Sequence, residues 1–164
     1  MNNIDIVNGI VFQNLGISNN NFENRLISQK KIYILQVLGI NLGFSYNWYV
    51  RGPYSPALTS YLYNNIEVLS SEDFSKYTLT DEAKKSINLV NSLSEYKRDL
   101  GLSVAQTYEL LASLLYIIRN KKIWKATDND KIITLLLRYK PQFTKTQCEN
   151  ALKIIYDRLL DGQE

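Results

Sequence analysis

The side chains that most often carry chemistry in enzymes are scarce in this chain. It contains no histidine, which removes the commonest general base and the commonest zinc ligand. Its single cysteine, Cys148, lacks an imidazole partner and falls on the apolar face of an expected helix, so we expect core packing. The carboxylates of Asp81-Glu82 and Asp128-Asp130 lie at expected helix starts, where dipole and capping account for them. We therefore predict no catalytic residue, no metal site, no cofactor and no enzyme activity.

Cationic side chains around a tryptophan form a second group of candidate residues, which could bind nucleic acid. Lysine and arginine neutralise phosphates, and an aromatic ring between them can stack on a base. The candidate nucleic-acid-binding residues are Lys84, Lys85, Arg119, Lys121, Lys122, Trp124 and Lys125. A structural interpretation also holds, because cations complement the negative end of the preceding helix while Trp124 closes the core. The helix expected at a recognition position, over 56–66, has no lysine or arginine, which disfavours a DNA reader.

Aromatic side chains point to a protein partner instead. The chain has twelve tyrosines, and many of its aromatic residues cluster between positions 46 and 63. Tyrosine, tryptophan and arginine are the residues most enriched at protein–protein hot spots. We predict that Tyr49, Arg51 and Tyr54 form the outward-facing, partner-binding set. The alternative is that an AT-rich coding sequence raises the number of tyrosines and that their rings only fill the core.

These three residues belong to a segment with a strong local pattern. Apolar and aromatic residues alternate with polar ones over 44–50, which predicts a half-buried strand. Gly52 and Pro53 are expected to end that strand, and Ser55 followed by Pro56 is typical of a helix start. Two prolines this close restrict the turn, so its side chains are presented at low entropic cost.

Helices are expected on both sides of this turn. We predict a short helix within 1–20, a helix over 23–42 stopped by Gly43, and a helix over 56–64. A short extended piece at 77–79 precedes further helices that begin at Thr80, Ser103, Thr127 and Thr144. The helix after Ser103 has the widest apolar stripe and is expected at the centre of the fold. The order predicts a mainly α fold with a small β element, a winged-helix-like core plus C-terminal helices.

Length and charge set the wider limits. The 164 residues suit a single domain over 1–164, with a winged-helix-like core at about 23–96 and a helical C-terminal part at about 103–160. The net charge of +3 and pI of about 8.8 are only mildly basic. No apolar run is long enough for a membrane span, and no signal peptide is seen. A cytoplasmic protein with no membrane association is expected, and homo-oligomerisation is left open.

Two segments resemble a known protein group. The block WYVRGPYSPAL, preceded by KKIYILQVLG, resembles the YwgA-like group of uncharacterised bacterial and archaeal proteins. The segment RYKPQFTKTQCENALKII is similar to that group's element before its last helix, with Gln142 in place of the group's histidine. The Gly-Pro turn also looks, more distantly, like the motif of the Panacea (SocA-like) antitoxin domain. That resemblance implies a small helical protein that binds a partner such as a toxin, or acts as an adaptor in a defence or mobile-element context.

Two functions are therefore expected from different classes. The first is a non-enzymatic protein-interaction module that works through Tyr49, Arg51 and Tyr54. The alternative is a winged-helix-like nucleic-acid-binding regulator that uses the cationic residues.

Overall fold

A computed structural model describes residues 1–160 as a mainly helical protein with one small antiparallel sheet. This confirms the predicted fold class at that level, while the winged-helix-like arrangement stays a prediction. The helices are α1 (Asn3–Leu15), α2 (Phe22–Val37), α3 (Pro56–Ser71), α4 (Asp81–Ser92), α5 (Lys97–Leu100), α6 (Val104–Arg119), α7 (Lys121–Trp124), α8 (Asn129–Tyr139) and α9 (Lys145–Ile154). A 3-10 turn (Leu93–Tyr96) joins α4 to α5, and a π turn (Ile155–Leu159) extends α9.

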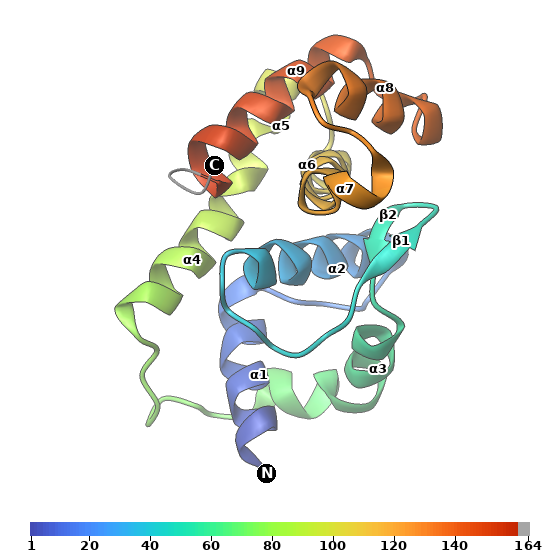
Figure 1. Ribbon diagram of the computed structural model, residues 1–164. Coiled ribbons are helices and arrows are strands. Elements are labelled where there is room, and N and C mark those ends of the chain that lie inside the picture. The colour runs from blue at the N-terminus through green and yellow to red at the C-terminus, as the bar shows by residue number, and fades with distance from the viewer. Residues whose placement is uncertain (161–164) are drawn as a thin grey trace.

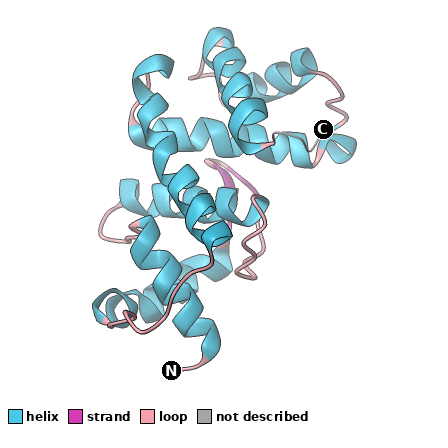
Figure 2. Ribbon diagram, turned by 90° about the vertical axis from the view of Figure 1, so that its left-hand side faces the viewer, coloured by secondary structure: helices cyan, strands magenta, loops and turns pink. Residues whose placement is uncertain are grey.

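The chain folds into two halves with a hairpin at their boundary. Helices α1, α2 and α3 lie in the lower half of Figure 1, and α8 and α9 lie in the upper half, with α6 seen end-on between them. The strands β1 (Asn47–Tyr49) and β2 (Gly52–Tyr54) form the hairpin, which Figure 2 shows between the two groups of helices. The hairpin therefore touches both α2 and α6.

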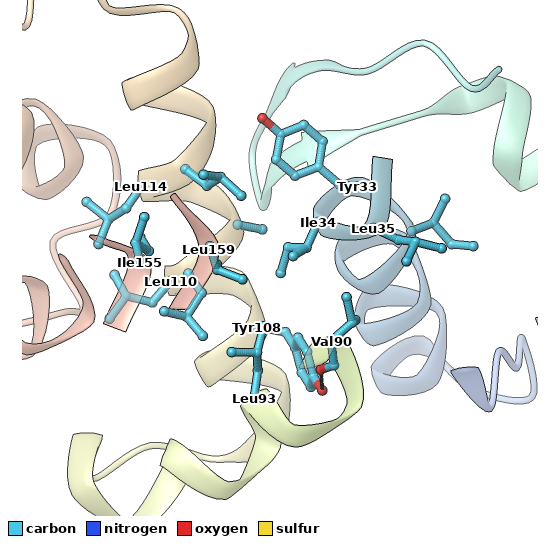
Figure 3. Close-up of a cluster of buried hydrophobic side chains, with 14 of the residues drawn as sticks. Tyr33, Ile34, Leu35, Val90, Leu93, Tyr108, Leu110, Leu114, Ile155 and Leu159 are labelled. Atoms are coloured by element: carbon cyan, nitrogen blue, oxygen red, sulfur yellow. Dashed lines mark hydrogen bonds between the residues drawn. The ribbon is translucent and has the colours of Figure 1, made fainter. Parts of the chain in front are cut away.

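Helix α6 is the centre of the core, as its wide apolar stripe predicts. It packs against α2, α8 and α9, and all its residues from Thr107 to Leu115 are buried. Figure 3 shows Leu110 and Leu114 of this helix beside Ile155 and Leu159 of the C-terminal turn. The predicted capping box at Ser103 starts this helix, where side chain and backbone exchange hydrogen bonds with Gln106.

Most predicted helix starts are confirmed by their cap geometry. Thr80 accepts from the Ala83 amide, and Thr144 forms the second predicted capping box. Asp128, and not Thr127, caps α8, because the Asp128 carboxylate accepts from the Lys131 amide. Cys148 is fully buried, and this burial raises the pKa of its thiol to about 11, as suits a core residue.

Three predicted element boundaries are wrong. Helix α2 ends at Val37, five residues before the expected 42, because Gly39 takes a φ of +106° and the Gln36 side chain binds the backbone of Leu42 and Phe44. Helix α3 runs on to Ser71, well past the expected 64. Residues 77–79 form no strand, since no neighbouring strand in the described chain pairs with them.

The predicted strand over 44–50 is also corrected. Only Asn47–Tyr49 pairs as a strand, and the Gly-Pro residues that were expected to end it form the second strand of the hairpin. Proline is tolerated there because the sheet has two strands only, so both are edge strands. No single helix in the described part of the chain is long and apolar enough to cross a membrane.

Candidate functional site

The candidate site is built on the hairpin and its tight turn. Trp48 pairs with Pro53, Tyr49 pairs with Gly52, and the turn exposes 88% of the Val50 side chain. Successive residues of a strand point to opposite faces, so Trp48 and Tyr49 lie on different sides of the hairpin. The inner side faces the C-terminal helices, and the outer side faces α2 and α3.

Gly52 lets the hairpin approach α6 closely. Its φ of +92° lies in the region that favours glycine, and an added Cβ would collide with the Ser113 hydroxyl. That hydroxyl is the one buried side-chain oxygen or nitrogen without a hydrogen-bond partner among residues 1–160. Gly52 is therefore part of the scaffold, and its role is close packing against α6.

Two buried lysines bind the backbone of the hairpin. The Lys30 ammonium on α2 donates to the Pro53 carbonyl at 2.6 Å. The Lys140 ammonium, just after α8, donates to the Val50 carbonyl at 2.9 Å and to the Glu109 carboxylate at 2.9 Å. Lys30 and Lys140 are each 1% exposed and Glu109 is 3% exposed. This cluster fixes the turn and the second strand of the hairpin to the helical core.

The charge balance of this cluster is uneven, because two lysines share one acid. Burial lowers the pKa of Lys30 from its usual 10.5 to about 7, with Glu109 opposing the shift and Lys140 and Arg51 adding to it. Burial also lowers the pKa of Lys140, while its hydrogen bond to Glu109 raises it. Lys30 is therefore the member of the cluster that loses its proton near neutral pH.

The amide of Gln29 holds the chain that enters α3. It donates to the Ser55 carbonyl at 2.9 Å and accepts from the Ser55 amide at 2.9 Å. Ser55 caps α3 and Pro56 follows at its first position, as predicted. The Tyr54 hydroxyl lies 2.6 Å from the Thr59 hydroxyl, which orients its ring on the outer face.

An apolar groove of about 400 Å³ opens on this outer face, and it brings the three predicted partner-binding residues together. Its lining is Asn19, Phe22, Arg25, Leu26, Gln29, Lys30, Tyr49, Val50, Arg51, Tyr54, Thr59, Leu62 and Tyr63. The rings of Tyr49 and Tyr54 meet edge to face at 5.2 Å, and the Arg51 guanidinium lies 5.3 Å from the Phe22 ring centre. The lining contains three basic side chains and no carboxylate.

The inner face of the hairpin is closed by an aromatic cluster. Trp48 packs edge to face on Trp124 at 4.9 Å, and Tyr116 and Tyr139 complete the cluster. Trp124 is half-buried by these contacts. Its ring therefore joins the hairpin to α7, which is the structural interpretation that the sequence left open.

The predicted cationic residues do not share one surface. Arg119, Lys121, Lys122 and Lys125 are exposed around α7, whereas Lys84 and Lys85 are exposed on α4. Figure 1 shows α4 and α7 well apart. Lys84 lines a different, more polar cleft of about 620 Å³ next to α1. That cleft contains none of the predicted partner-binding residues, which lie together in the hairpin groove.

Sequence reasoning missed several residues of this site. Phe22 and Tyr63 line the groove with 56% and 84% of their side chains exposed, although neither belongs to the predicted set. Glu109 had a usable signal, since it is a lone charge within the apolar stripe of α6. Lys30 gave only a weak one, a lysine doublet beside a buried helical face. Among residues 1–160, no three His, Cys, Asp or Glu side chains gather to hold a metal ion.

Comparisons with protein-family models, with curated proteins and with solved structures give no match to this chain. The resemblance to the YwgA-like group therefore stays a prediction.

Proposed function

We propose that this protein is a non-enzymatic interaction module that binds a segment of a partner protein in the hairpin groove. The observation that carries the proposal is the lining of that groove. Tyr49, Arg51 and Tyr54 are joined there by the exposed rings of Phe22 and Tyr63. In the cell, such a module would act as an antitoxin-like protein or as an adaptor.

The groove has the physical properties of a hot-spot pocket. Its volume of about 400 Å³ accommodates one or two bulky apolar side chains. Tyrosine and arginine supply large contact areas there, and tyrosine loses little conformational entropy on binding. Lys30, Lys140 and Gln29 already fix the hairpin to the core. A groove that is rigid before binding loses less free energy to ordering.

The charges of the groove define its occupant. Arg25, Lys30 and Arg51 line it, and no aspartate or glutamate does. Complementary potentials favour a partner segment with an aromatic or aliphatic anchor flanked by acidic residues. We infer that the anchor fills the space between Phe22 and Tyr63 while an acidic group faces Arg51.

Selection from a displayed library of random peptides tests this proposal. We expect enriched sequences to combine a bulky apolar residue with acidic neighbours. Tyr49→Ala and Arg51→Ala remove exposed groove side chains and are expected to weaken binding of the selected peptides about tenfold or more. The matched controls are Tyr77→Ala and Arg98→Ala, exposed residues outside the groove, and these are expected to bind normally.

The same experiment has two contradicting outcomes. If the groove variants bind the peptides as well as the wild type does, the groove is not the site. If circular dichroism shows that Tyr49→Ala and Arg51→Ala unfold, the turn is scaffold and the proposal loses its residues.

A second candidate function, nucleic-acid binding, rests on the turn at α7. Arg119, Lys121, Lys122 and Lys125 are exposed, and none forms an ion pair within residues 1–160. Because Trp124 packs against other rings, the expected contact is electrostatic. Binding of duplex or single-stranded DNA should then fall steeply with salt and weaken in the Lys121→Gln/Lys122→Gln variant. No binding at low salt would rule this function out.

A further inference from the structure

The ammonium of Lys30 has few hydrogen-bond partners for a buried group. Within residues 1–160, the Lys30 ammonium donates only to the Pro53 carbonyl. The Lys140 ammonium donates to both the Val50 carbonyl and the Glu109 carboxylate. A neutral amine keeps two N–H groups, so it still donates to Pro53. A charged ammonium has a third N–H, and nothing else in the described chain accepts it.

The surroundings of Lys30 include charged groups from three other elements. Glu109 faces it from α6, Lys140 from the end of α8, and Arg51 from the hairpin turn. Arg51 and Lys30 also line the groove, together with Arg25 from the preceding turns of α2. With two cations and one acid around it, the buried ammonium lacks a counter-ion, and the open groove is the side from which one can arrive.

We propose that Lys30 and Arg51 form a carboxylate subsite in the hairpin groove, and that an acidic side chain bound there brings one proton onto Lys30. This inference rests on the proposed function, because the acidic group belongs to the same partner segment. It goes further by naming the group that is recognised and by making its recognition dependent on pH.

The coupling follows from elementary electrostatics. A carboxylate beside Arg51 offsets one of the two positive charges that disfavour the Lys30 ammonium, and it attracts that ammonium directly. Both effects raise the pKa of Lys30 above its value of about 7 in the free protein. By linkage, a ligand that raises a pKa takes up protons when it binds, and its affinity falls as the pH rises through that range.

Phenylpropionate and phenylpropanamide are suitable probes because they differ only in charge. Both carry a ring for the apolar groove, and the acid is ionised above about pH 6. We expect the dissociation constant of phenylpropionate, from NMR titration, to rise about tenfold between about pH 7 and pH 8.5. Phenylpropanamide should bind more weakly and show no such change. Calorimetry in buffers of different ionisation enthalpy should detect proton uptake with the acid alone.

Variants assign the proton to its residue. Lys30→Met keeps the apolar bulk, and it is expected to abolish proton uptake and the pH dependence. Lys97→Met removes an exposed lysine outside the groove and should keep both. Where Lys30→Met fails to fold, the absence of proton uptake by the wild type would still refute the subsite.

The outcomes separate this inference from the proposed function. If both probes shift groove resonances equally, without proton uptake, the groove binds apolar groups but the carboxylate subsite is refuted. If neither probe shifts groove resonances, the groove and the subsite fail together. Proton uptake that persists in Lys30→Met would overturn the assignment to Lys30.

Discussion

Replacing Lys30 by methionine tests the energetic reasoning behind the buried cluster, with no ligand involved. Methionine fills similar space without a titratable group. In the wild type, burial lowers the pKa of Lys30 from its usual 10.5 to about 7. Between these two values the unfolded chain binds more protons than the folded chain, so the free energy of unfolding rises with pH. The stability lost to burying Lys30 is therefore largest below about pH 7 and disappears above 10.5.

The size of the effect follows from the same two pKa values. A difference of one pKa unit corresponds to about 1.4 kcal/mol, which is also the limiting slope per pH unit for one group. Lys30 is half-protonated in the folded protein at about pH 7, so the slope develops above that pH. Between about pH 7 and pH 9 the wild type should gain about 2 kcal/mol more stability than Lys30→Met does. Other groups, including Lys31 and Lys140, titrate in both proteins and largely cancel.

Urea denaturation monitored by circular dichroism, repeated at several pH values, measures this difference. The comparison uses the pH dependence and not the absolute stability, because the variant also loses the hydrogen bond to Pro53. Lys153→Met removes an exposed lysine and should show the same pH dependence as the wild type. Parallel stability profiles for the wild type and Lys30→Met would refute the claim that Lys30 is buried with a lowered pKa.

Three further changes test the packing of the hairpin, each by denaturant unfolding. Gly52→Ala should destabilise the protein by about 2 kcal/mol or more, because the positive φ and the collision with Ser113 both oppose a Cβ. Ser113→Ala should be neutral or stabilising by about 1 kcal/mol, since it removes a buried hydroxyl without a partner. Combined with Gly52→Ala it should recover part of the loss, and additive effects would contradict the proposed collision. Glu109→Gln should cost about 3 kcal/mol by leaving Lys140 without its counter-ion, and an unchanged midpoint would argue against a buried ion pair.

Local signals were sufficient to predict much of the fold. Helix starts depend on one side chain and its nearest backbone amides, so Ser55, Thr80, Ser103 and Thr144 could each be identified from a few neighbouring residues. The central position of α6 followed from its wide apolar stripe. The hairpin could not be predicted in the same way. The close packing that requires glycine at position 52 is against Ser113, which lies 61 positions later in the chain.

In the candidate site, too, local patterns predicted some residues, whereas tertiary packing brought the others together. Tyr49, Arg51 and Tyr54 were predicted because strand alternation places residues on one face or the other, and they do line one groove. The buried charged residues Lys30, Glu109 and Lys140 come from α2, α6 and the end of α8. They are too far apart in the sequence for a local pattern to predict that they meet. Trp124 shows the same limit, because its contact with Trp48 joins residues 76 positions apart in the sequence.

Lowered lysine pKa values alone do not identify a site, because structural ion pairs perturb them too. Burial also lowers the pKa of Lys31, yet its ammonium donates to the Leu15 carbonyl and the Asn91 amide oxygen, away from the groove. Lys140 has its counter-ion in Glu109. Lys30 differs from both, because it lines an open apolar groove and its ammonium donates, within residues 1–160, to the Pro53 carbonyl alone. Its hydrogen bond to Pro53 helps to hold the hairpin, but that bond needs only a neutral amine. The position of Lys30 beside the groove is therefore the observation that separates the proposed carboxylate subsite from an ordinary buried lysine.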